Sequence, residues 1–97
     1  MKPIDEVLAT EEAKWRAKSF TEIADILGVV QCYPRRFGDT DYELEVHSKR
    51  GTKEDEIVVM VECSTKGRLM GTFSGQAKYF VISKTSGVRD IERDEAF

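Results

Sequence analysis

The sequence predicts an α+β domain in which two N-terminal helices pack on one antiparallel sheet, a meander of four to five strands. Apolar residues recur at helical spacing up to Gly28. Beyond it, apolar and polar residues alternate with a period of two, in segments separated by turn signals. The connections between the predicted strands are short, which favours antiparallel neighbours. We therefore expect one domain over residues 1–97, with a helical front at 3–28, a sheet at 29–91 and a frayed acidic tail at 92–97.

The first helix is expected to begin at Pro3. Proline suits the first turn of a helix, because its missing N–H would have no intrahelical partner there. The pair Ala9–Thr10 is a point where this helix can be interrupted, and the segment from Glu11 to Trp15 breaks strict amphipathicity. Apolar side chains fall roughly along one stripe of this helix: Ile4, Val7, Leu8 and Trp15.

The second helix is expected over Phe20–Leu27. Ser19 and Glu22 have the spacing of a capping box, in which each side chain accepts a hydrogen bond from the backbone N–H of the other residue. The apolar residues of the segment recur at helical spacing, and Gly28 follows as a left-handed C-cap.

Short segments with strand patterns make up the rest of the chain. We expect them at Val29–Tyr33, Tyr42–His47, Ile57–Cys63, Arg68–Phe73 and Ala77–Lys84, with a short final element over Val88–Ile91. The first is an edge strand or an extended connector, because the proline that follows it cannot donate to a ladder. The third is apolar at both its odd and its even positions, as expected of a central strand covered on both faces. Strands of this number and length are compatible with an open sheet or with a barrel.

Composition indicates a soluble cytoplasmic protein. The chain is 40% hydrophobic and 34% charged, with a net charge of −3. No apolar run is long enough to cross a bilayer, and the N-terminus turns acidic where a secretory signal would turn apolar. Cys32 and Cys63 are far apart in sequence and are expected to be reduced.

No motif in the sequence indicates catalysis, so we expect a protein that is not an enzyme and has no cofactor or metal. His47 is the only histidine. Together with Cys32 and Cys63 it lacks the closely spaced ligand pairs of structural zinc sites. The glycines of the sheet region follow neither the P-loop pattern nor the dinucleotide-binding pattern.

An arginine–aromatic segment, Tyr33-Pro34-Arg35-Arg36-Phe37, is the most unusual stretch of the chain. Two arginines flanked by aromatic rings suit phosphate contacts and base stacking. With the preceding Leu27-Gly28-Val29 and the following aspartate, this stretch resembles the start of the wedge domain of RecG-type branch-migrating helicases, over about a dozen residues. The resemblance implies an oligonucleotide-binding barrel whose later strands contact branched DNA. The candidate binding residues are Tyr33, Arg35, Arg36, Phe37, Lys49, Arg50 and Arg68.

A structural role for the same segment is the competing interpretation. Tyr33 and Phe37 then anchor the crossover from helix to sheet, and the arginines pair with Asp39, Asp41 or glutamates of the first helix. The chain also lacks the basic excess that a dedicated duplex-DNA binder normally shows.

Three functions remain open on these grounds. The first is a small interaction, accessory or immunity-like factor of bacterial or phage type, which contacts a protein partner or a second copy through a sheet edge beside Pro34 or through a sheet face. The second is binding of single-stranded or branched nucleic acid. The third is an enzyme or small-ligand carrier with an aromatic-lined pocket. The charged loop at residues 49–56 is a further candidate contact.

Overall fold

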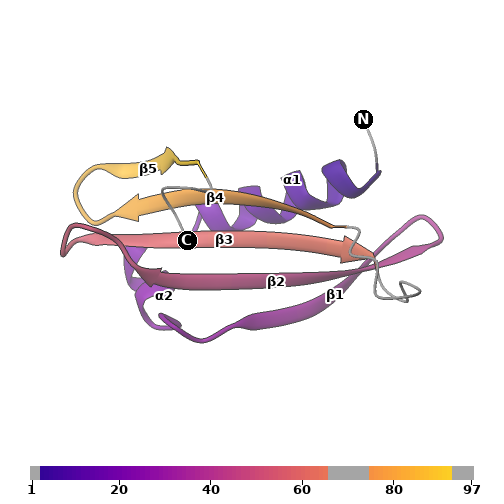
Figure 1. The fold of residues 1–97 in the computed structure, drawn as a ribbon, viewed down its shortest axis with the longest axis horizontal. Helices are drawn as coiled ribbons and strands as arrows, with labels where there is room; N and C mark the ends of the chain where they lie inside the picture. The colour runs from indigo at the N-terminus through magenta and orange to yellow at the C-terminus, as the bar shows by residue number, and fades with distance from the viewer. Residues whose placement is uncertain (1–2, 66–74, 93–97) are drawn as a thin grey trace.

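A computed structural model describes residues 3–65 and 75–92 of the chain, and these residues form two helices and a five-stranded antiparallel sheet (Figure 1). The elements follow one another as α1 (Pro3–Arg16), α2 (Phe20–Ala24), β1 (Gln31–Phe37), β2 (Thr40–Arg50), β3 (Glu56–Thr65), β4 (Gly75–Ser83) and β5 (Gly87–Asp90). The predicted α+β class is confirmed. In this part of the chain no helix has the length and apolar character that crossing a membrane requires.

α1 is one continuous helix and passes through Ala9 and Thr10 without a break. The hydroxyl of Thr10 donates to the carbonyl oxygen of Glu6 at 2.9 Å. This bond lies within the helix, one turn back, and the backbone of Thr10 keeps its helical conformation. The possible interruption at this pair is therefore not used.

α2 is shorter than predicted, with five residues. Its capping box is confirmed: Ser19 Oγ accepts the N–H of Glu22 at 3.1 Å, and the Glu22 carboxylate accepts the N–H of Ser19 at 3.0 Å. Beyond the helix the chain turns more tightly, since the N–H groups of Ile26 and Leu27 bond to carbonyls three residues back. Gly28 has a φ of +79° and ends these turns, whereas the helix itself has already ended.

The strands form a meander in the order β1-β2-β3-β4-β5, each antiparallel to its neighbours in the chain. β1 continues through Pro34 to Phe37, beyond the predicted end at Tyr33. An edge strand tolerates proline because its outward side needs no donor. β3 pairs directly with β4, and the predicted strand Arg68–Phe73 lies outside the described residues.

The sheet is open. Within the residues that the structure describes, β1 pairs only with β2 and β5 only with β4, so these two strands are its edges (Figure 1). An oligonucleotide-binding fold curls its strands into a partly open barrel. The strands described here do not form the barrel that the resemblance to the helicase wedge domain implies.

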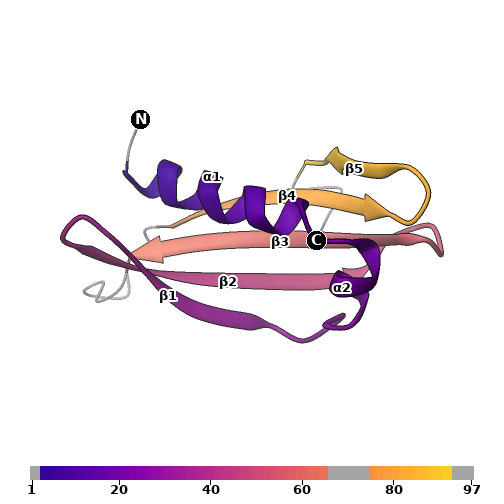
Figure 2. The same ribbon diagram turned by 180° about the vertical axis from the view of Figure 1, so that it is seen from behind.

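The two faces of the sheet are covered differently. The inner face carries α1 and α2, and α1 lies across β3 and β4 (Figure 2). The main core lies between this face and the helices, and its most deeply buried members are Leu8, Ile23, Leu44, Val46, Val59, Val61, Cys63 and Phe80. On the outer face, Val58 and Val81 form a second, small cluster with Tyr79 and Ile91. Tyr79 and Val81 of β4 therefore lie on the outer face, and Phe80 and Ile82 lie on the inner face.

The predicted charged loop at residues 49–56 is shorter in the structure, because β2 runs to Arg50 and β3 begins at Glu56. Asp55 connects this loop to the turn between β4 and β5. Its carboxylate accepts the hydroxyls of Thr85 at 2.8 Å and Ser83 at 3.0 Å, and these bonds lower the pKa of Asp55. One end of the sheet is thus held by two connected turns.

Candidate functional site

The arginine–aromatic segment is divided between the two faces of β1. Tyr33 and Arg35 lie on the inner side and contact Glu11 of α1. Successive residues of a strand point to opposite faces, and Arg36 pairs with Asp41 at 3.4 Å away from the helices. The structure therefore does not present the two arginines together. Each arginine pairs with an acidic residue, Arg36 with Asp41 of the hairpin and Arg35 with Glu11 of α1. These are the pairings expected if the segment has a structural role.

Glu11 is the centre of a hydrogen-bonded cluster, with a side chain only 3% exposed. Its Oε1 accepts the hydroxyl of Tyr33 at 3.0 Å. Its Oε2 accepts Lys14 Nζ at 3.1 Å and Arg35 Nε at 3.2 Å. Trp15 Nε1 in turn donates to the Tyr33 hydroxyl at 2.8 Å. Three donors on one carboxylate offset the cost of removing its charge from water.

These contacts set the protonation state of the cluster. Burial alone would raise the pKa of Glu11, but the bonds from Lys14, Tyr33 and Arg35 outweigh it and hold this pKa below its ordinary value of 4.5. Burial raises the pKa of Tyr33, and the Glu11 carboxylate beside it acts in the same direction. At neutral pH the cluster therefore holds an ionised Glu11 and a protonated Tyr33.

A cavity of about 300 Å³ lies over this cluster, between α1 and β1. Lys18 and Trp15 contribute to its wall, with Lys18 Nζ 5.1 Å from the centre of the indole ring. The guanidinium carbon of Arg35 lies 4.9 Å from the centre of the Tyr33 ring. Three cationic side chains and one carboxylate line the cavity, so its formal charges, three positive and one negative, sum to +2. We call it the α1–β1 cavity.

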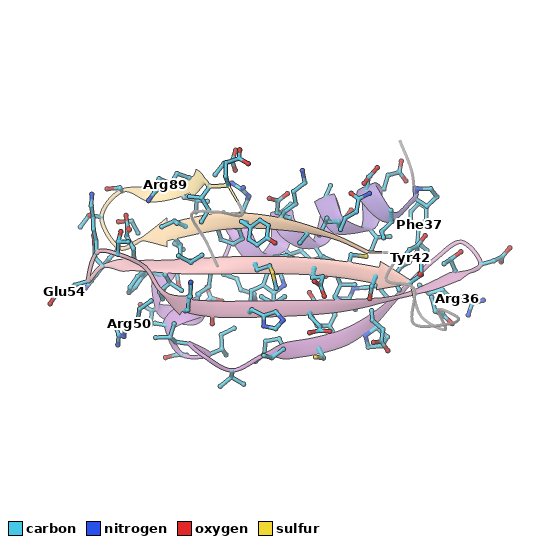
Figure 3. The ribbon with its side chains drawn as sticks, in the orientation of Figure 1. Arg36, Phe37, Tyr42, Arg50, Glu54 and Arg89 are labelled. Atoms are coloured by element: carbon cyan, nitrogen blue, oxygen red, sulfur yellow. The ribbon has the colours of Figure 1, made fainter. Side chains whose placement is uncertain are left out.

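The other candidate cations are spread along the sheet. Figure 3 shows Arg36 and Phe37 at one end of the molecule, at the hairpin between β1 and β2, and Arg50 near Glu54 at the opposite end. Lys49 and Arg50 are exposed at the end of β2, and Arg68 lies outside the described residues. The structure brings Tyr33 and Arg35 together and leaves Lys49 and Arg50 far from them.

Exposed apolar side chains gather at the two ends of β1. Val29 and Val30, just before the strand, are 57% and 46% exposed, and Phe37 at its end is 44% exposed. Among the described residues one further large apolar side chain is exposed, Val88 on β5 at 37%. Three of the four large apolar side chains that are exposed among the described residues therefore lie at the ends of β1.

The middle of β1 is unsuited to continuous pairing with another strand. Pro34 has no N–H, and its carbonyl accepts Nη1 of Arg35 at 3.3 Å. Proline and charged side chains on an edge strand are devices that prevent uncontrolled sheet extension. A partner at this edge must therefore contact mainly the side chains at the two ends of the strand.

A larger cavity lies elsewhere, between α1 and the end of the sheet formed by β4 and β5, with a volume of about 610 Å³. Arg16 pairs there with Glu12 at 3.0 Å and with Asp90, and it lies 5.0 Å from the centre of the Phe80 ring. Its cation is thus met by two carboxylates. We place the candidate site at the smaller α1–β1 cavity, where the cations outnumber the carboxylates.

The three residues considered for a zinc site do not converge. Cys32 is exposed and His47 lies on the outer face, where it contacts Glu45 at 3.1 Å, whereas Cys63 is buried in the core. Burial raises the pKa of the Cys63 thiol to about 11, and the charge of Glu11 adds to this effect. In the part of the chain that the structure describes, no three His, Cys, Asp or Glu side chains are placed to hold a metal ion.

Sequence reasoning missed Glu11, Lys14 and Lys18 as members of a site. A signal for Glu11 is present in the sequence: it lies four residues after Val7 and four before Trp15, on the apolar stripe of the helix. A carboxylate at such a position is buried and needs donors. The two lysines carry no comparable signal, because lysines are common at the surface of any protein.

The fold and the site define a small α+β protein with a cation-lined cavity beside an apolar-flanked sheet edge. No family model, no curated protein and no solved structure matches this chain.

Proposed function

We propose that this chain is a small non-enzymatic interaction or accessory protein that binds a cytoplasmic protein partner along the β1 side of its sheet. The observation that carries the proposal is the placement of exposed apolar side chains, with Val29 and Val30 before β1 and Phe37 at its end. A partner that covers these side chains gains free energy from the apolar area removed from water. A strand of seven residues spans roughly 20 Å, so one partner surface reaches both ends.

Pro34 determines the kind of contact. Because this residue interrupts the donors of the outer edge, the partner is held by side chains near Val30 and Phe37 more than by a continuous ladder. A second copy of the chain meets the same requirement, since two β1 edges related by a two-fold axis present the same apolar side chains to each other.

Nucleic-acid binding receives less support from the distribution of charge. A single-strand binder needs cations along one path that follows the phosphates. Here Arg35 shares the carboxylate of Glu11 and Arg36 pairs with Asp41. Lys49 and Arg50 lie at the opposite end of β2 from the residues that pair with these two arginines.

The experiment that tests the proposal compares two exposed valines. A photo-crosslinking amino acid is placed at Val30 on the β1 side or at Val88 on the opposite edge, and each protein is irradiated in cells. Sedimentation velocity of the wild type, Val30→Glu and Val88→Glu then measures their oligomeric state. It shows whether the partner in a discrete crosslinked product is a second copy of the chain. Val88 is the matched control because it is also an exposed valine at a sheet edge.

We expect a discrete crosslinked product from position 30 and none from position 88. If the product is a dimer, Val30→Glu should dissociate it and Val88→Glu should not. Equal crosslinking from both positions, or from neither, would contradict the proposal.

A further inference from the structure

We infer that the α1–β1 cavity binds a phosphate monoester carried by a side chain of the protein partner. The cavity is lined by Lys14 of α1, by Lys18 just after the end of this helix and by Arg35 of β1, and it lies beside the edge proposed to hold that partner. The inference therefore rests on the proposed function and adds the chemistry of the partner to it.

The charge of the cavity suits a dianion. Lys14 and Arg35 meet at the same oxygen of Glu11, whose carboxylate cancels one positive charge. Lys18 lies just beyond the end of α1 at Arg16, and it lines the same cavity with its Nζ 5.1 Å from the centre of the Trp15 ring. The remaining charge of +2, three cations less one carboxylate, matches a phosphate monoester, which carries roughly −1.5 to −2 at neutral pH.

The cations also have donors to spare. An ammonium group has three N–H donors, and the structure assigns one from Lys14 to Glu11. Lys14 is 53% exposed and Arg35 is 45% exposed, so part of each side chain faces solvent and can donate to a ligand while its bond to Glu11 is kept. Glu11, which is buried, holds these two cations side by side before any ligand arrives.

The charges of a neighbouring cavity favour a phosphorylated protein over a nucleic acid as the ligand. It has a volume of about 260 Å³, shares Trp15 and Lys18 with the α1–β1 cavity, and is lined further along by Glu22 and Asp25. The Glu22 carboxylate accepts the Ser19 backbone N–H, which lowers its pKa and keeps it ionised. A chain with a phosphate on every residue would be repelled by these carboxylates. A peptide with one phosphate beside a basic residue has charges opposite to those of the two cavities.

Trp15 provides the measurement, because it is the only tryptophan of the chain and lines both cavities. Its fluorescence is followed while the full chain is titrated with a phosphoserine–lysine peptide, the same peptide without phosphate, inorganic phosphate, or an oligothymidine without terminal phosphates. The titrations are repeated with Lys18→Gln and with Lys53→Gln. Lys18 donates no hydrogen bond to Glu11 in the cluster, and Lys53 is an exposed lysine of the β2–β3 loop that serves as the matched control.

We expect saturable binding of the phosphopeptide that is tighter than that of the other three probes. Lys18→Gln should weaken it by up to about fivefold, the range of one exposed ion pair, and Lys53→Gln should leave it unchanged. Equal binding of the unphosphorylated peptide, or no effect of Lys18→Gln, would overturn the inference.

The remaining outcomes separate the source of the phosphate and the two proposals. Equal affinity for inorganic phosphate would reject a peptide carrier, and tighter binding of the oligothymidine would point to nucleic acid. Absence of phosphopeptide binding together with crosslinking at position 30 would reject the phosphate site alone. Phosphopeptide binding without that crosslinking would instead count against the β1 edge as the contact.

Discussion

The hydroxyl of Tyr33 connects β1 to two side chains of α1, since it accepts from Trp15 Nε1 and donates to Glu11 Oε1. Tyr33→Phe removes this hydroxyl and leaves both neighbours one partner short in a part-buried site. We expect the free energy of unfolding to fall by about 1–2 kcal/mol, as for other buried hydrogen-bonding groups that lose a partner. Urea unfolding followed by circular dichroism measures it.

A double-mutant cycle provides the control for this substitution. In a Trp15→Phe background one of the two hydrogen bonds is already absent, so Tyr33→Phe should cost less there than in the wild type. The same cost in both backgrounds would mean that the bond from Trp15 adds no stability.

Glu11 should make the protein less stable in acid. Its pKa is lower in the folded chain than the ordinary value of 4.5, because the donors around it outweigh the effect of burial. The unfolded chain therefore takes up this proton first as the pH falls. The stabilisation from Glu11 is complete above its ordinary pKa and is lost as the pH falls through the lowered pKa.

Glu11→Gln tests this dependence, because the amide does not titrate. The stability difference between wild type and Glu11→Gln, from urea midpoints between pH 7 and roughly pH 3, should shrink as the pH falls. The lowered pKa values of Glu22 and Asp55 are common to both proteins and cancel in the comparison. A difference that stays constant over this range would contradict the assigned ionisation of Glu11.

At the scale of elements, α2 depends on its cap. A helix of five residues has little stability of its own, and the capping box satisfies backbone donors that would otherwise be free. We expect Ser19→Ala to cost about 1 kcal/mol in thermal or urea unfolding. Thr21→Ala, an exposed position two residues on, is the control and should cost much less. Equal losses would show that the cap adds nothing beyond helix propensity.

The limits of prediction at this scale also have physical causes. The capping box of α2 and the alternating faces of β4 depend on local sequence, and both were predictable. The early end of α2 and the continuation of β1 past Pro34 depend on tertiary position. A strand can contain proline only where its outward side has no partner, and which strand is at the edge is decided by the whole sheet.

For the molecule as a whole, the class and the antiparallel meander could be predicted because short connections leave few alternatives. The candidate site could be predicted only in part. Tyr33 and Arg35 were marked by composition, but their meeting with Glu11 depends on how α1 crosses the sheet, which no local pattern contains. Arg35 and Arg36 are adjacent in sequence, but the first contacts Glu11 on the inner side of β1 and the second pairs with Asp41 away from the helices.

The unequal covering of the two sheet faces leads to a whole-molecule prediction. Val58 and Val59 are adjacent in β3, both buried, and point to opposite faces. Val59 lies in the main core under the helices, where neighbours on all sides resist collapse, and Val59→Ala should cost about 2–3 kcal/mol. Val58 is backed by a small cluster that can close over the lost methyl groups, so Val58→Ala should cost about 1 kcal/mol. Urea unfolding of the two variants compares them directly. Equal costs would show that the outer face is packed as firmly as the inner one and would remove the asymmetry.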